Sequence, residues 1–532
     1  MGKSIASALL LASCSLFAAG AANAETLRMA YGTAPVSADP YPYSDTQTGA
    51  LSEHVFEMLV GLDDSPLLAT EWAWESDNAI VFKLREGVSF SNGAPFTARD
   101  IVYSMCRMMY RVDGKANVVT SALGPVTDVV VVDDHTVRFE TTAPYPIITQ
   151  KLKFMKVLSA TAAGVEGDIA FDQDGDCGIA DLYPSQADFD AGTAAIGTGP
   201  YIYESFQATG DANLVRNDNY WGDLPEWDRV EIRSVPNNGA RIAGLLAGDY
   251  DIVERPSAED LQVIERDDNF AYSTVPGLQT IFLVLDTNAE GAGGVTAADG
   301  SAPLADMRVR QALSMAIDRK AITERLFAGN ATAANQFAPS YMPGAPEMPD
   351  LVTDLDQAKA LLAEAGYADG FEVELNVPAD RYTNGPLVAQ AISQYWTRLG
   401  VKVTLRTEPW SVFQTRRTGG EMGVFMYGWG HPQGAAQLIS GAFAQRNDDL
   451  GLGAANYSNY DSPEFEELIQ AWAVEVDPAR SDELVAEAMA QAVADLPGIP
   501  LYYNHELWAH RAGIELTGGA EGRTVASMAR SR

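Results

Sequence analysis

The chain has 532 residues, more than one hydrophobic core usually supports, so two or more lobes are expected. Hydrophobic residues make up 47% and charged residues 20%, which excludes a disordered chain, and no run of 18 apolar residues beyond the N-terminus is available to cross a bilayer. The 72 acidic and 36 basic side chains give a formal net charge of −36, which repels nucleic acid and anionic membrane surfaces and disfavours both as partners.

The N-terminal 24 residues have the composition of a secretory signal. Lys3 precedes an apolar run from Ile5 to Ala19, and Ala22-Asn23-Ala24 is typical of a cleavage site before Glu25. The tetrapeptide Leu11 to Cys14 is also similar to a lipobox, but the residues after it are small and apolar instead of forming a polar tether. The sequence therefore favours a soluble periplasmic protein, with no membrane insertion after cleavage, over a lipoprotein.

The segment from Leu68 to Met109 predicts two strands and a helix. Apolar residues alternate from Ile80 to Leu84, and Glu86-Gly87 turns the chain toward Val88 to Phe90, which predicts a hairpin. Thr97 with Asp100 three residues later forms a capping box, which predicts the start of a helix there.

Further elements of the first half follow from the same patterns. Thr26 to Tyr31 is a predicted strand, and Leu51 to Val60 has helical spacing. Val126 to Glu140 predicts a second hairpin, and Arg241 to Asp251 predicts a helix that ends at Gly248 and leads into a strand.

An acidic segment imitates a calcium-binding loop. Asp172, Asp174 and Asp176 occupy the first, third and fifth positions, where carboxylate oxygens suit a hard cation. The sixth position holds Cys177 instead of Gly and the twelfth holds Tyr183 instead of Glu, so a solvated acidic loop is the alternative. Cys177 and Cys106 would remain after signal cleavage in an oxidising compartment, as a disulfide or as two separate buried thiols.

The second half alternates strands and helices. Leu278 to Asp286 is a nearly continuous apolar run, which predicts a strand buried on both faces. Asp306 to Ile322 and Leu387 to Leu399 have helical spacing, the second ending at Gly400, and a strand follows at Val401 to Leu405. This order predicts a mostly parallel sheet.

Several blocks resemble one family. The residues from Trp74 to Ser104 read W-E-S-D followed, from Phe82, by F-x-L-R-x-G-V-x-F-x-N-G-x-P-F-T-A-x-D-I-V-Y-S, and later segments match G-T-G-P-Y and V-R-Q-A-L-x-x-A-I-D-R. Together they resemble bacterial solute-binding proteins of the peptide/nickel/opine class, which feed ABC importers. The resemblance implies an α/β two-lobed periplasmic binding protein fold, with an extra subdomain in lobe one and two hinge crossovers between the lobes. Lobe one is expected at 25–278 plus 498–532, after the signal at 1–24, and lobe two at 279–497.

The resemblance also implies where a ligand binds. Arg381-Tyr382-Thr383-Asn384 resembles an R-P-Y-N motif of the dipeptide binders, whose Arg pairs with the peptide carboxylate. The loop with Asp39-Pro40 lines the cleft in that family. The family's Asp for a ligand amine is missing after Trp429, so His431 or Gln433 would have to substitute for it. The candidate ligand contacts are Tyr31, Arg381, Tyr382, Trp410, Tyr427, Trp429, His431 and Gln433. A solvated loop arginine and core aromatic residues are the alternatives.

No catalytic pattern stands out. The five histidines form no H-E-x-x-H, there is no G-x-S-x-G, and the two cysteines lack a zinc spacing. We therefore expect a monomeric binding protein and not an enzyme. It is expected to need no cofactor, although a structural calcium ion is possible. Its expected partners are a small solute and the permease subunits of an ABC transporter, to which it delivers that solute. A carboxylate-bearing modified peptide, amino-acid conjugate or opine is favoured over an oligosaccharide or a nickel chelate. Outside the transport class, the sequence leaves a periplasmic hydrolase and a chaperone open.

Overall fold

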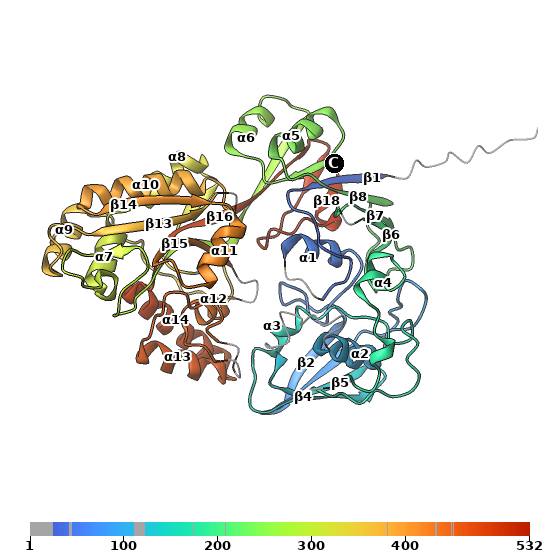
Figure 1. Cartoon of the computed structure of the whole chain (residues 1–532). Coiled ribbons are helices and arrows are strands. Elements are labelled where there is room, and N and C mark those ends of the chain that lie inside the picture. The colour runs from blue at the N-terminus through green and yellow to red at the C-terminus, as the bar shows by residue number, and fades with distance from the viewer. Residues whose placement is uncertain are drawn as a thin grey trace, which may run out of the picture.

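The structure is a computed structural model with two lobes (Figure 1). It describes residues 25–41, 45–110, 123–173, 175–207, 209–379, 381–430, 434–447, 450 and 452–532. Most of the yellow to red elements form the lobe on the left of Figure 1. The blue to green elements form the other lobe together with the red C-terminal strand β18, and that lobe is itself divided into an upper and a lower part.

One large mixed sheet runs through both lobes. Its order is β11-β13-β15-β10-β16-β9-β1-β8-β7-β6, with β14 beside β13 and β12 beside β16. The strands are β1 (Thr26–Tyr31), β6 (Tyr201–Phe206), β7 (Ala212–Arg216), β8 (Arg229–Ser234), β9 (Ile252–Glu254), β10 (Phe270–Leu285), β11 (Val295–Thr296), β12 (Ala331–Ala333), β13 (Glu372–Pro378), β14 (Lys402–Glu408), β15 (Val424–Gly430) and β16 (Gly498–Arg511).

Two smaller sheets belong to lobe one. The lower part holds an antiparallel sheet of order β2-β3-β5-β4, and β17 pairs with β18 near the C-terminus. Their bounds are β2 (Ala69–Ser76), β3 (Ala79–Leu84), β4 (Val126–Asp133), β5 (Thr136–Thr141), β17 (Ile514–Leu516) and β18 (Ala529–Ser531). The lower part is the extra subdomain that the family resemblance implies.

Helices cover the sheets on both sides of the hinge. Lobe one contains α1 (Thr46–Glu53), α2 (Ala98–Met109), α3 (Ile148–Leu152), α4 (Gln186–Asp190), α5 (Asn238–Ala247) and α6 (Ala258–Ile264). Lobe two contains α7 (Met307–Met315), α8 (Arg319–Phe327), α9 (Leu355–Glu364), α10 (Gly385–Leu399), α11 (Trp410–Thr418), α12 (Ala435–Phe443), α13 (Pro463–Ala473) and α14 (Pro478–Asp495).

Strands β10 and β16 connect the lobes. They pair antiparallel along most of their length, with a register shift between Pro276 and Thr280. Before this shift β16 also pairs with β9 of lobe one, and after it β10 pairs with β15 of lobe two. The predicted boundary after Leu278 falls at this shift. The return crossing lies within β16, because residues 498–503 still pair with the lobe-two half of β10.

The predicted mostly parallel sheet of lobe two is wrong for the sheet as a whole, because β11 pairs antiparallel with β13, β10 pairs antiparallel with β15 and β16, and β12 pairs antiparallel with β16; parallel pairing is confined to the strands around β13. β13 pairs in parallel with β14 and with β15, and α10 runs between β13 and β14 in the sequence. The predicted helix end at Gly400 is confirmed, since Gly400 adopts a left-handed conformation with φ 99° that closes α10. The apolar run from Ile281 to Leu285 is buried, as its composition predicts.

The predicted hairpin between Ile80–Leu84 and Val88–Phe90 is wrong. Both edges of β3 are occupied, one by β2 and the other by β5, so no edge remains for residues 88–90. Ser89 instead forms an isolated bridge with Pro95. The capping box of Thr97 and Asp100 is confirmed at the start of α2, and the second hairpin is confirmed as β4 and β5.

Two predicted helices have different bounds in the structure. The helix predicted at 51–60 ends at Glu53, because the carbonyl groups of His54 and Val55 accept hydrogen bonds from Tyr201 and Gly199 instead of continuing a helix. The segment from Asp306 to Ile322 is split into α7 and the start of α8. Asp318 accepts a hydrogen bond from the amide of Ala321 at 2.9 Å and thereby caps a new helix.

Candidate functional site

A cavity of about 540 Å³ lies between the lobes, where β10 and β16 cross. We call it the interlobe cavity. Its walls include the loop after β1, the start of α1, the crossing strands and the end of α8. Three further segments of lobe two complete them, at residues 381–384, 410–417 and 427–430. A cavity of this size and mixed polarity is typical of a site for a small organic molecule.

The three lobe-two segments meet because their strands are parallel. Pro378 at the end of β13 lies opposite Glu408 at the end of β14, so the loops that follow both strands leave from the same edge of the sheet. The loop after β13 carries Arg381 and Tyr382, and α11 after β14 begins at Trp410. Segments far apart in the sequence therefore line one wall.

Five of the eight predicted ligand contacts lie in this wall. They are Arg381, Tyr382, Trp410, Tyr427 and Trp429, and all of them line the interlobe cavity. The parallel pairing of β13 with β14 and with β15 brings the segments that carry them together. The family resemblance predicts this grouping, and the sheet explains it.

The aromatic residues of the wall hold Arg381 and each other in place. The guanidinium carbon of Arg381, an exposed side chain, lies 5.0 Å from the centre of the Trp410 ring. The rings of Tyr427 and Trp429 stack with centres 5.9 Å apart. Tyr382 is nearly buried, and its hydroxyl accepts a hydrogen bond from the amide of Gly428 at 2.8 Å, which ties the Arg381 loop to β15.

The sequence analysis missed Arg417, a further cation in the wall. Arg417 lies seven residues after Trp410 in α11, which places both on one face of the helix. Its guanidinium carbon lies 4.3 Å from the centre of the Tyr457 ring and 4.8 Å from that of Tyr427. The seven-residue spacing from Trp410 was the signal available in the sequence.

The opposite wall, from lobe one and the hinge, is strongly polar. Glu506 of β16 lines it, and burial raises the pKa of its carboxyl group, with nearby Arg255 opposing the shift and Glu254 adding to it. Burial lowers the pKa of neighbouring His505. The cavity therefore presents hydrogen-bonding groups and charges of both signs, but no nucleophile with an adjacent base is evident among its described lining residues.

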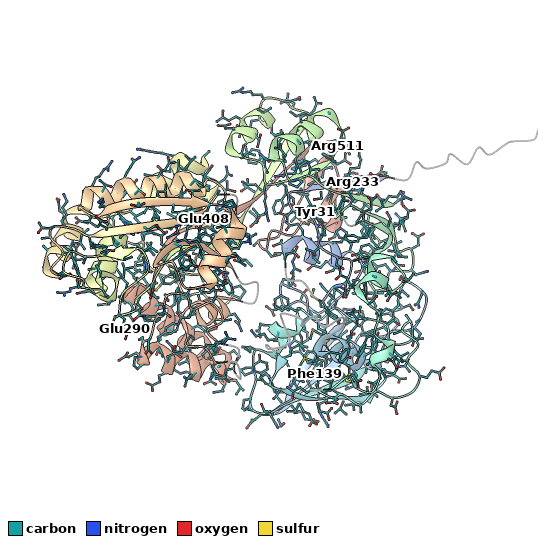
Figure 2. The ribbon with its side chains drawn as sticks, in the orientation of Figure 1. Tyr31, Phe139, Arg233, Glu290, Glu408 and Arg511 are labelled. Atoms are coloured by element: carbon teal, nitrogen blue, oxygen red, sulfur yellow. A yellow bond between two sulfur atoms is a disulfide. The ribbon has the colours of Figure 1, made fainter. Side chains whose placement is uncertain are left out.

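Tyr31 is not a ligand contact in this structure, which corrects the prediction. Tyr31 is the last residue of β1, and its side chain is fully buried in lobe one (Figure 2). Its hydroxyl donates to the carbonyl of Thr524. Strand β1 lies between β8 and β9 inside the large sheet, so Tyr31 packs in the core instead of facing the interlobe cavity. His431 and Gln433 lie outside the described residues.

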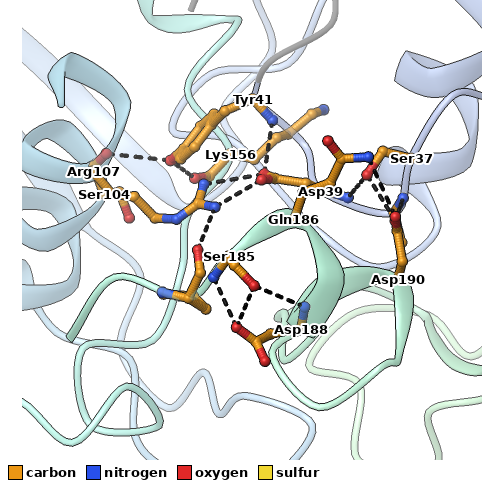
Figure 3. Close-up of polar contacts among 12 residues, drawn as sticks. Ser37, Asp39, Tyr41, Ser104, Arg107, Lys156, Ser185, Gln186, Asp188 and Asp190 are labelled. Carbon is orange, nitrogen blue, oxygen red and sulfur yellow. Dashed lines mark hydrogen bonds and ion pairs between the residues drawn. The ribbon is translucent and has the colours of Figure 1, made fainter. Parts of the chain in front are cut away.

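Asp39 also has another role than the family resemblance implies. Its carboxylate forms a two-pronged ion pair with Arg107 of α2, at 3.0 and 2.7 Å, and both side chains are almost fully buried (Figure 3). Arg107 also donates to the carbonyl of Pro184 at 3.0 Å. Asp39 therefore joins the loop after β1 to α2 and to the irregular segment before α4, inside lobe one.

The acidic loop is linked to α2 by the disulfide that the sequence left open. Cys177 bonds to Cys106, with α-carbons 6.0 Å apart. In the loop, the Asp176 carboxylate accepts a hydrogen bond from the amide of Gly178 at 2.8 Å, and Asp174 lies outside the described residues. Among the described residues no three acidic, histidine or cysteine side chains group as metal ligands. Calcium binding to Asp172, Asp174 and Asp176 stays a prediction.

A search of the described helices finds none long and apolar enough to span a membrane. Residues 65–447 match a family model described as "Bacterial extracellular solute-binding proteins, family 5 Middle". The chain is 27% identical over 489 residues to heme-binding protein A of Haemophilus influenzae, covering 86% of this chain and 83% of that protein. It is also 27% identical over 472 residues to the dipeptide-binding protein of Escherichia coli, covering 84% of this chain and 82% of that protein.

A solved structure with the same fold comes from another Haemophilus species. HbpA2 from Haemophilus parasuis superposes with a TM-score of 0.78 at 26% identity, covering 95% of this chain and all of that one. The likeness extends over both lobes.

Proposed function

This chain belongs to family 5 of the bacterial extracellular solute-binding proteins, which serve ABC importers and are not enzymes, and we propose that the solute it binds carries a carboxylate. Arg381 is the observation that carries this proposal. It is exposed at the interlobe cavity, and no acidic group of the described residues lies within ion-pair distance of it. The solute would be a peptide-like molecule or an amino-acid conjugate.

The chemistry of Arg381 suits a carboxylate. A guanidinium presents parallel N–H donors that match two carboxylate oxygens, and its charge is permanent. Trp410 beneath the guanidinium limits its rotation, which lowers the entropy lost when a ligand binds. Trp410 and Trp429 also offer flat faces to an apolar part of the solute.

Binding would close the two lobes around the solute. Among the described strands, only β10 and β16 carry the large sheet across the hinge, and their pairing is interrupted between Pro276 and Thr280. A solute that contacts Arg381 on one wall and β16 on the other stabilises the closed state. We infer that the permease subunits of the importer recognise this closed monomer in the periplasm, after removal of residues 1–24.

Calorimetry of the ligand-free protein against a panel of solutes tests the proposal. The panel contains N-acylated dipeptides, free dipeptides, opines, oligosaccharides and nickel-histidine complexes. We expect binding of members with a carboxylate, and we expect Arg381→Gln to weaken it by roughly tenfold to a hundredfold, the value of one or two charge-assisted hydrogen bonds. Preference for neutral oligosaccharides would instead support the sugar alternative, in which the two tryptophans stack on the rings.

Arg398→Gln provides a matched control. Arg398 lies in the last turn of α10, with its guanidinium 5.7 Å from the Tyr395 ring, and it does not line the interlobe cavity. This variant removes the same charge from the same lobe and should bind like the wild-type protein. Equal affinity of Arg381→Gln and wild type for every carboxylate ligand would refute the role of Arg381. Mass spectrometry of the bound solute should recover it intact.

A further inference from the structure

Arg417 is a buried cation whose donors are mostly unused. Its side chain is only 7% exposed, and Nη2 donates to Oε1 of Gln414 at 2.8 Å. Nε and Nη1 have no hydrogen-bond partner among the described residues, and no described carboxylate lies within ion-pair distance. Burying a charge without partners is unfavourable, so an arginine in this state points to a group that is absent from the protein itself.

Other buried or partly buried arginines of this chain have partners for more of their donors, and in Arg107 only Nε lacks one. Arg319 donates to the carbonyl groups of Pro500 and Ser314 and to the Ser314 hydroxyl. Arg107 pairs with Asp39. Arg416, the neighbour of Arg417 in α11, contacts three carboxylates, those of Glu374, Glu408 and Glu421. Arg417 differs from these arginines because two of its nitrogens, Nε and Nη1, lack a hydrogen-bond partner, and because it lines the interlobe cavity.

Two aromatic rings lie against the guanidinium of Arg417. Tyr457 and Tyr427 lie under the guanidinium at 4.3 and 4.8 Å, where the ring faces attract a cation. This attraction offsets part of the cost of burial and fixes the plane of the guanidinium. The N–H groups of Nε and Nη1 lie in that plane and stay available to a ligand.

Arg381 and Arg417 share one tryptophan. The centre of the Trp410 ring lies 5.0 Å from the guanidinium carbon of Arg381 and 5.9 Å from that of Arg417. The two cations are thus separated by no more than the sum of these distances. A molecule of modest size can reach both while it contacts Trp410.

We propose that the solute carries two acidic groups, one bound by Arg381 and the other by Arg417, joined by an apolar or planar part that contacts Trp410. This inference rests on the proposed function and narrows its solute class from a carboxylate to a dianion. Closure of the lobes would exclude water from both ion pairs and strengthen them.

A matched pair of probes tests the second acidic group. N-succinyl-alanyl-phenylalanine has two carboxylates, and N-butanoyl-alanyl-phenylalanine has the same acyl length with one carboxylate. Both are titrated into the refolded, ligand-free full-length protein together with mono- and dicarboxylate members of the panel above. We expect each dicarboxylate to bind roughly tenfold to a hundredfold more tightly than its monocarboxylate counterpart, and Arg417→Gln to remove this difference.

The outcomes separate this inference from the proposed function. If carboxylate ligands bind but the second carboxylate adds no affinity, the dianion is refuted and the proposed function stands. If no ligand with a carboxylate binds, both are refuted.

Thermal melting of the ligand-free variants distinguishes binding from a structural role. Because the charge of Arg417 is buried without a carboxylate partner among the described residues, Arg417→Met should leave the melting temperature unchanged or raise it. Arg416→Gln is the control in the same helix. It breaks three ion pairs, so it should lower the melting temperature while the preference for dicarboxylates persists. If Arg417→Met lowers the melting temperature and the preference persists, Arg417 is structural and the inference is overturned.

Discussion

Replacing Asp39 with Ala should destabilise lobe one without affecting solute binding. The substitution removes the carboxylate that pairs with Arg107, whose side chain is 1% exposed. Arg107 would keep its hydrogen bond to Pro184 and its contact with the Phe189 ring at 4.5 Å, but its charge would be buried and uncompensated. Breaking a buried ion pair from one side costs about 3 to 5 kcal/mol.

Urea unfolding monitored by circular dichroism measures the loss in free energy of unfolding. The lobe-one transition is fitted separately, because a two-lobed protein need not unfold in one step. The double variant Asp39→Leu with Arg107→Met removes both charges and should recover most of the stability, since an apolar pair of similar volume avoids the desolvation cost. A loss below about 1 kcal/mol in Asp39→Ala, as for an exposed pair, would refute the reasoning. If Asp39→Ala binds the solute more weakly than the wild-type protein does, the loop with Asp39-Pro40 has the ligand role that the family resemblance implies.

Two further predictions concern pH and calcium. Burial lowers the pKa of His54 from 6.5 to about 4, and its Nε2 accepts a hydrogen bond from the amide of Ala526. The unfolded chain binds a proton at His54 more tightly than the folded protein does, so the contribution of His54 to the free energy of unfolding should be complete above pH 6.5. It should fall by up to about 3 kcal/mol as the pH drops toward 4. Unfolding measured as a function of pH should show a weaker pH dependence in His54→Gln. If the predicted loop binds calcium, adding calcium after chelator treatment should raise the melting temperature, and Asp172→Asn should abolish this increase. An unchanged melting temperature of the wild-type protein would refute the calcium site.

Local signals in the sequence predicted those parts of the fold that depend on nearby residues. The capping box of Thr97 and Asp100, the left-handed glycines that close α5 and α10, and the buried run in β10 were all predicted correctly. The predictions of a hairpin at residues 80–90 and of a helix at 51–60 were wrong. In both cases distant strands or loops took the hydrogen-bonding positions that the local pattern offered.

For the candidate site, family resemblance supplied Arg381, Tyr382, Trp410, Tyr427 and Trp429, and the structure gathers all five at one cavity. It also suggested Tyr31 and Asp39, which the structure places in the core of lobe one.

The sequence by itself determined the family, the two-lobed α/β architecture and the segments that carry the site, because these are written in motifs and in short-range periodicity. Only the tertiary structure decided which charges are paired. Arg416 and Arg417 are adjacent and chemically identical in the sequence, yet one faces three carboxylates and the other faces the interlobe cavity with unused donors. Whether an arginine is satisfied depends on groups brought to it from other strands, and no local pattern records that.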